Sequence, residues 1–266
     1  MRVQLLGTGS ADGWPNPWCD CASCADQRGR GLLRTPTSAV VEGRLLLDCG
    51  PETPRQAERL GVRLREVEAV VIGHAHHDHL DPSFLLYRGW ATDRPLTVIG
   101  PAPAIAQCAA WLDPGDTRVR LVPVTAGDRV EVVGLSLQVL PAAHEAFGEA
   151  VLHLVGDGRS RLLYATDTGP LPKATLAALT GVGLDLLLLE ETFGTRTSHA
   201  TQHHDLPAFA ATVAALREIG SVSPATDVVA VHLSHHNPPL PELEAALAAC
   251  GARCVPDGAV IDTTGA

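Results

Sequence analysis

Short apolar runs, each closed by glycine, proline or polar residues, alternate along the chain with a few amphipathic stretches. The run at 67–72 is rich in Val and Ile and breaks at Gly73, which is typical of a buried strand. The pattern predicts further strands at 3–6, 38–41, 45–47, 96–99, three within 119–140, and at 151–155, 161–165, 186–189, 228–231 and 260–261. It predicts helices at 56–60, 104–112, 174–179, 206–219 and 241–249.

Both halves of the chain mix strands and helices, and no Ser- or Gly-rich linker separates them. This order fits two β-layers packed face to face with helices outside. We therefore expect an α/β (α+β) fold with four layers, an αββα sandwich, in a single domain covering residues 1–266. The segment at about 10–36 is rich in Pro, Gly, Trp and Cys and is expected to form a loop.

A dense polar cluster follows the strand at 67–72. It contains His74, His76, Asp78 and His79, and a helix is expected directly afterwards, with Asp81 as N-cap and Pro82 as its first residue. Imidazole and carboxylate are good ligands for zinc, manganese or iron. Two of these ligands can point to one side of an extended loop and two to another, which favours two metals over one.

Three more potential ligands occur where predicted strands end. His144 follows the strand at 137–140, Asp167 follows 162–165 and His232 follows 228–231. One such residue would mean little, but three in succession after the first cluster indicate a shared metal centre.

Composition narrows the range of functions. The chain has 266 residues, 45% of them hydrophobic, a formal net charge of −10 and a single lysine, Lys173. This charge disfavours sequence-independent binding of long nucleic acid, which depends on Lys and Arg. No apolar run reaches the roughly 18 residues of a membrane span, and the start lacks the pattern of a signal peptide, so we expect a cytoplasmic protein without membrane contact.

Three of the seven cysteines crowd into Cys19, Cys21 and Cys24. In a reducing compartment such crowding indicates metal binding more than disulfides. A structural zinc needs four ligands, and His235, three residues after His232, is the expected fourth.

The His-x-His-x-Asp-His cluster followed by His144, Asp167 and His232 resembles the metallo-β-lactamase superfamily of metallohydrolases. The resemblance implies one metal on His74, His76 and His144, a second on Asp78, His79 and His232, and Asp167 bridging both. It also implies that Asp48, after the strand at 45–47, supports the ligands, and that Asp78 takes part in catalysis. Two such metals, Mn or Zn with Fe as a further option, can share a hydroxide formed near neutral pH.

Gly7-Thr-Gly9, the cysteine triplet, Thr166-Asp167-Thr168 and His232-Leu-Ser-His235 resemble the PhnP-like phosphodiesterases, accessory enzymes of the carbon–phosphorus lyase pathway. The pyrroloquinoline quinone accessory family carries a similar cysteine loop but departs from the complete histidine cluster. In PhnP-like enzymes a histidine before Asp-Leu and a helix acts near the phosphate, and His203 matches it. Glu190 could orient this histidine, while His199 and His204 are the other candidates for the role.

These observations predict a di-metal phosphodiesterase that hydrolyses a small ester, such as a cyclic phosphate of a nucleotide or ribose. A same-fold hydrolase of a lactone, thioester or tRNA precursor stays open, as does a cofactor-pathway accessory protein without turnover. No Lys/Arg-rich insertion that could clamp RNA is found. The resemblance also allows a homodimer.

Overall fold

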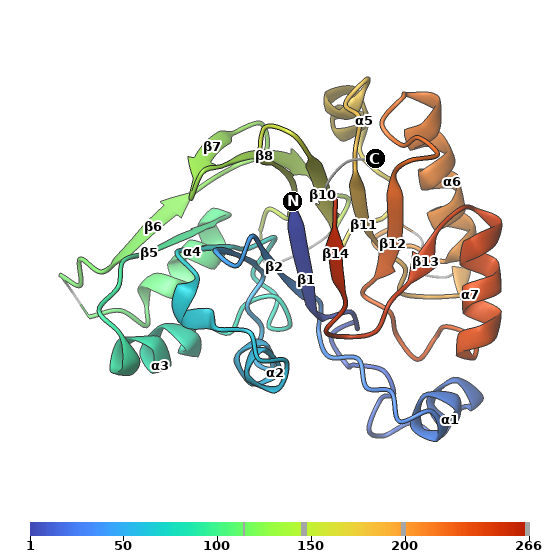
Figure 1. Ribbon diagram of the computed structural model, residues 1–266, viewed down its shortest axis with the longest axis horizontal. Helices are drawn as coiled ribbons and strands as arrows, with labels where there is room; N and C mark the ends of the chain where they lie inside the picture. The colour runs from blue at the N-terminus through green and yellow to red at the C-terminus, as the bar shows by residue number, and fades with distance from the viewer. Residues whose placement is uncertain (114, 145–147, 198–200, 264–266) are drawn as a thin grey trace.

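The computed structural model describes residues 1–113, 115–144, 148–197 and 201–263 of the chain. Two seven-stranded sheets pack face to face, and helices cover their outer faces (Figure 1). The α/β fold class and the four-layer αββα sandwich expected from the sequence are therefore confirmed.

The first sheet has the order β14-β1-β2-β3-β4-β5-β6, antiparallel from β14 to β3 and parallel from β3 to β6. Its strands are β14 (Val260–Asp262), β1 (Arg2–Gly7), β2 (Ser38–Val41), β3 (Leu45–Leu47), β4 (Ala69–Val71), β5 (Leu96–Gly100) and β6 (Val119–Pro123). Because β3 and β4 run parallel, the loops that follow them leave the same edge of the sheet.

The second sheet has the order β13-β12-β11-β10-β9-β8-β7, with a parallel half from β13 to β10 and an antiparallel half from β10 to β7. Its strands are β13 (Arg253–Cys254), β12 (Asp227–Val231), β11 (Leu186–Glu190), β10 (Arg161–Ala165), β9 (Val151–Gly156), β8 (Leu135–Pro141) and β7 (Arg129–Val132). The carboxyl ends of β10, β11 and β12 therefore meet at one edge.

Three apolar clusters hold the layers together. The central one lies between the sheets and includes Leu47, Val71, Tyr164 and Val231. A second packs the first sheet against α2 (Thr53–Arg59), α3 (Ser83–Ala91) and α4 (Ala102–Ala109). The third packs the second sheet against α5 (Lys173–Leu179), α6 (Leu206–Glu218) and α7 (Leu240–Ala249). The residues buried on both faces of each sheet explain why so many strands are continuous apolar runs.

Three local predictions were wrong. The expected loop at 10–36 contains helix α1 (Ala22–Gly29), whose first turn is capped by Cys21, since its Sγ accepts a hydrogen bond from the amide of Cys24 at 3.4 Å. Pro82, not Asp81, is the N-cap of α3, although Asp81 accepts a hydrogen bond from the Ser83 amide at 3.0 Å. Strand β13 was not predicted, because it has only two residues.

A short 3-10 turn, η1 (Leu64–Glu66), precedes β4, which covers only 69–71 of the strand expected at 67–72. Within the described ranges, no helix combines the length and apolarity that crossing a membrane requires.

Candidate metal centre

Strand ends deliver the predicted ligands to one place. His74, His76, Asp78 and His79 lie on the loop after β4, while His144, Asp167 and His232 follow β8, β10 and β12. The parallel pairing of strands brings these ends together, although His74 and His232 are 158 positions apart in the chain. The ligand atoms fall into two adjacent groups.

The first group consists of His74, His76 and His144, whose ring nitrogens lie within 4.8 Å of one another. His74 Nε2 is 2.9 Å and His144 Nε2 is 3.3 Å from His76 Nδ1. The pKa of His74 lies well below its usual value, because burial penalises the charged ring and the neighbouring His79 repels it. A neutral ring has a free lone pair, as metal ligation requires.

The second group consists of Asp78, His79, Asp167 and His232. His79 Nε2 lies 3.0 Å from Asp78 Oδ2 and 2.7 Å from Asp167 Oδ2, and His232 Nε2 lies 3.3 Å from Asp167 Oδ2. His79 Nε2 and Asp167 Oδ2 are buried and make no hydrogen bond despite their proximity. Two such orphaned atoms suit two ligands of one cation better than a hydrogen-bonded pair.

The carboxylates around His79 also shape its titration. Burial lowers the pKa of His79, but Asp78, Asp167 and Asp48 outweigh burial and raise this pKa well above its usual value. A position that attracts a proton this strongly also attracts a metal cation. The residues present therefore fit a divalent metal.

Asp167 lies between the two groups. Its Oδ2 faces the second group, while its Oδ1 lies 3.8 Å from His144 Nε2 of the first group. A carboxylate placed in this way can contribute one oxygen to each of two metals.

The residues at these strand ends have unusual backbones. Asp48, Asp167 and His232 adopt positive φ angles of 59°, 50° and 58°. Non-glycine residues rarely adopt this left-handed region, and such strain is concentrated at functional sites. Here it turns each side chain toward the ligand groups as the strand ends.

Asp48 orients His79. Its Oδ2 accepts a hydrogen bond from His79 Nδ1 at 2.7 Å, which leaves Nε2 of the same ring available as a ligand. Asp48 is itself fixed by the Gly73 amide at 2.9 Å and by the Tyr164 hydroxyl at 2.9 Å. The sequence indicated Asp48 but not Tyr164, because nothing distinguishes Tyr164 from the other residues of an apolar strand.

Thr192 orients His232 in the same way. The His232 Nδ1 lies 3.0 Å from Thr192 Oγ1, and that hydroxyl donates to Glu190 Oε2 at 2.5 Å. His232 Nδ1 therefore donates, and its Nε2 faces Asp78 and Asp167 of the second group, where it can bind a metal. The sequence indicated Glu190 but not Thr192, whose part in fixing His232 depends on a contact between residues 40 positions apart.

His203 lies beside both groups, with its Nδ1 3.1 Å from Glu190 Oε2 and 3.8 Å from Asp167 Oδ1. Burial lowers the pKa of His203, but the Glu190 carboxylate outweighs burial and raises it to about 9. Of the other two candidates, His204 is buried and lies 2.8 Å from Thr212 Oγ1 of α6, and His199 lies outside the described residues.

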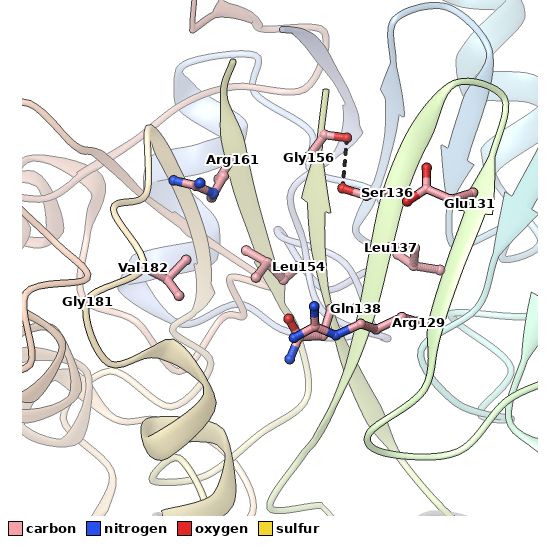
Figure 2. Close-up of a pocket in the computed structure, with 10 residues that line it drawn as sticks. All are labelled: Arg129, Glu131, Ser136, Leu137, Gln138, Leu154, Gly156, Arg161, Gly181 and Val182. Carbon is pink, nitrogen blue, oxygen red and sulfur yellow. Dashed lines mark hydrogen bonds between the residues drawn. The ribbon is translucent and has the colours of Figure 1, made fainter. Parts of the chain in front are cut away.

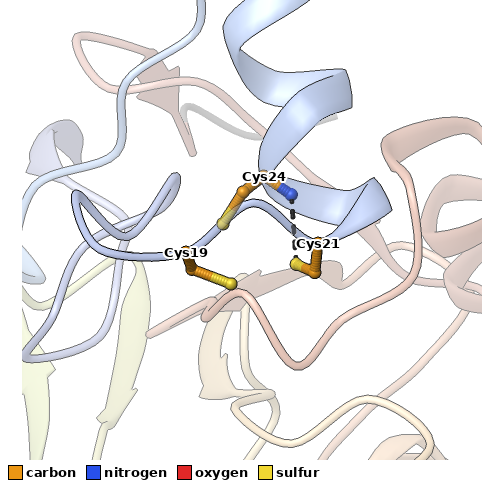
Figure 3. A group of neighbouring side chains, drawn as sticks. All are labelled: Cys19, Cys21 and Cys24. Atoms are coloured by element: carbon orange, nitrogen blue, oxygen red, sulfur yellow. Dashed lines mark hydrogen bonds between the residues drawn. The ribbon is translucent and has the colours of Figure 1, made fainter.

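The three cysteines form a separate group at the start of α1. The sulfur atoms of Cys19, Cys21 and Cys24 lie within 4.8 Å of one another (Figure 3). His235 does not belong to this group, and its Nδ1 instead lies 2.9 Å from Asp12 Oδ2. Asp12, which the sequence did not indicate, can orient the His235 ring, and the role of His235 as fourth zinc ligand stays a prediction.

A cavity of about 360 Å³ lies on strands β7 to β10 (Figure 2). Its walls include Arg129, Glu131, Gln138 and Arg161, and none of the predicted site residues. The chemistry proposed below therefore does not involve this cavity.

Comparison with known proteins fits this geometry. The model of the beta-lactamase superfamily domain matches residues 43–233, which include every predicted ligand of the two groups. The chain belongs to the metallo-β-lactamase superfamily. A ribonuclease Z from Methanopyrus kandleri is 36% identical over 149 residues, which are 54% of this chain and 47% of that protein. The chain covers 16%, 30% and 47% of the length of three curated relatives that it matches.

Solved structures of this superfamily share the fold over nearly the whole chain. A diphosphatase from the PhnP family superimposes with a TM-score of 0.78 at 22% identity, covering 98% of this chain and 97% of that one. Zinc-bound PqqB from Methylobacterium extorquens gives a TM-score of 0.77 at 22% identity, covering 98% and 100%. At this identity the likeness establishes the fold alone.

Proposed function

We propose that this superfamily hydrolase is a two-metal phosphodiesterase that acts on a small ester, cyclic phosphates of nucleotides or ribose included. The observation that carries the proposal is the position of Asp167 between two ligand groups, with the His203–Glu190 pair beside them. The metals would be two of Mn, Zn or Fe, held by the seven predicted ligands. When bound, such a pair supplies Lewis acidity and activates water near neutral pH.

The chain's own residues would divide the remaining work. Asp48 and Thr192 hold His79 and His232 in the tautomers that present Nε2, and Asp78 acts through the ligand group to which it belongs. His203 would donate a proton to the leaving oxygen as its bond to phosphorus breaks. Because its Nδ1 faces Glu190, its Nε2 is the donor in this step.

Hydrolysis of bis-p-nitrophenyl phosphate by the metal-stripped chain resupplied with Mn or Zn tests this proposal. We expect turnover that Asp167→Ala abolishes and that the exposed control Asp93→Ala leaves unchanged. A panel of cyclic nucleotides, a diphosphate, a lactone and a tRNA precursor would then assign the bond. No turnover of any phosphodiester with any of these metals would contradict the proposal.

Replacement of His203 tests its role as proton donor. We expect His203→Ala to lower kcat/KM about 10²- to 10⁴-fold on esters with alkyl leaving groups, the usual contribution of general acid catalysis. The nitrophenolate group leaves without a proton, so its ester should be affected much less. Equal losses on both substrates would assign His203 to phosphate binding instead.

A ribonuclease acting on tRNA precursors is the second candidate, because a ribonuclease Z is 36% identical to this chain over 149 residues. The net charge of −10 and the single lysine favour the small substrate. If the chain cleaves a tRNA precursor faster than any cyclic phosphate in the panel, the ribonuclease becomes the first candidate.

A further inference from the structure

The turn that follows β11 is clamped onto the segment that carries His203. The amides of Thr192 and Phe193 both donate to the carbonyl oxygen of His204, each at 3.0 Å, and the Leu206 amide donates to the Gly194 carbonyl at 2.8 Å. These hydrogen bonds hold the backbone directly after His203, and the orientation of its ring then depends on its side-chain torsions.

Phe193 is in contact with the His203 ring. The two ring centroids are 5.6 Å apart with planes at 61°, an edge-to-face arrangement. Glu190 Oε2 lies 3.1 Å from His203 Nδ1, and the rings of His144 and His232 lie at centroid distances of 4.9 and 5.9 Å from the His203 ring. The Glu190 carboxylate alone would allow the His203 ring to rotate over a range of torsion angles while keeping its hydrogen bond. The Phe193 ring excludes those torsion angles at which the two rings would overlap.

Phe193 is itself held by the loop after β12. Its ring stacks on His236 with centroids 5.2 Å apart and planes at 15°. The backbones are also pressed together, because a Cβ on Gly194 would lie 2.5 Å from the His236 carbonyl oxygen and 2.8 Å from Asn237 Cα. Asn237 Nδ2 further donates to the Glu191 carbonyl at 3.3 Å.

We propose that Phe193, backed by His236, is a positioning residue that fixes the orientation of the His203 imidazole and so aims its Nε2 at the leaving oxygen. This inference rests on the proposed function, since it assigns Phe193 a task in proton donation. The loop after β12, which carries His236, also carries the ligand His232 and His235, and the backbone carbonyl of His235 lies 3.7 Å from Cys21 Sγ. Phe193 and His236, which we call the brace, thus connect the cysteine loop, the metal ligands and the proton donor.

Phe193→Leu removes the aromatic ring while keeping an apolar side chain. We expect kcat/KM on an alkyl phosphodiester to fall about 10- to 100-fold, because a misaimed donor transfers its proton poorly. On the nitrophenyl ester, which needs no proton, the change should stay below about 2-fold. Phe193→Tyr keeps the ring and should restore the alkyl activity. Trp90→Leu, at an exposed aromatic of α3, is the matched control.

Two outcomes would overturn the inference. A rise in KM on both esters would assign Phe193 to substrate contact, and unchanged kinetics on both would assign it no role. Metal content and the melting temperature of each variant identify any loss caused by unfolding.

A readout without turnover separates this inference from the proposed function. In the metal-free chain with isotope-labelled histidine, the nuclear Overhauser effect should connect the His203 and Phe193 rings, and the His203 carbon-bound protons should lose their ring-current shift in Phe193→Leu. If the wild type shows these signals but hydrolyses neither ester, the proposed function fails while the brace stands. If the signals are missing, the brace is refuted whatever the activity.

Discussion

Single residues at strand ends determine which ring nitrogens are available to a metal. Asp48 and Thr192 each engage the Nδ1 of a histidine, and in both rings Nε2 is left toward the ligand group. This arrangement could be predicted only in part. Asp48 carries a ligand-type side chain directly after an apolar run, whereas Asp12 follows no such run, and Tyr164 and Thr192 have side chains that occur at many structural positions.

Asp48→Asn tests the orienting role. The amide can no longer accept the His79 Nδ1 proton as a carboxylate does, so we expect metal affinity to fall about 10- to 100-fold. Titration against a chelating dye would measure the affinity, with Asp93→Asn, at an exposed site, as the control. An unchanged affinity would mean that Asp48 is only a turn residue.

The charge state of His203 tests its pairing with Glu190. Its pKa of about 9 means that the metal-free imidazole is protonated at neutral pH and loses its proton as the pH rises through 9. Glu190→Gln removes the negative charge that favours the protonated form and leaves burial, which opposes it. The pKa should then fall to about 6.5 or below. Histidine NMR titration measures both values, and a pKa that does not change would contradict the pairing.

At the scale of elements, the strands were easier to predict than their margins. Runs such as 186–189 and 228–231 are apolar on both faces, and the structure places them in the parallel half of a sheet. Helix α1 escaped prediction because its turn depends on a cysteine cap and on contact with α7, where the Leu240 amide donates to Asp26 at 3.0 Å. Neither the cap nor the contact produces a periodic pattern of apolar residues in the sequence.

Close packing between two loops positions the first ligand cluster. Gly50, after β3, lies so close to the loop after β4 that a Cβ there would be 2.0 Å from the Asp78 carbonyl oxygen. Gly50→Ala should displace this loop, lowering metal affinity and reducing the free energy of unfolding by about 1–3 kcal/mol. Denaturant unfolding and dye competition check the two effects.

Gly29→Ala, at the end of α1, is the matched control, because a Cβ there meets nothing within 4 Å. We expect this control to be neutral or slightly stabilising in a helix. A Gly50→Ala variant that binds metal like the wild type would show that the loop adjusts without cost to the site.

The whole molecule brings two sheets together so that strand ends from both supply one centre. The loops after β3 and β4 come from the first sheet, and those after β8, β10, β11 and β12 come from the second. The sequence could predict this convergence because a repeated arrangement, an apolar strand followed by His or Asp, marks each contributor. It could not predict the contacts between loops, which depend on the distances between elements.

The number of metals bound by the whole chain follows from its ligand groups. The two ligand groups and the cysteine group together lead us to expect about three metals per chain. Cys24→Ser should remove about one of them and leave the two metals of the histidine and aspartate groups in place. Elemental analysis after dialysis measures both, and a wild type with one metal would contradict the count.

Anomalous X-ray diffraction at the absorption edge of the bound metal would locate the metals themselves. We expect two peaks, one on each side of the Asp167 carboxylate, with His74, His76 and His144 around one and Asp78, His79 and His232 around the other. A single peak there, or peaks that leave Asp167 uncoordinated, would contradict this expectation.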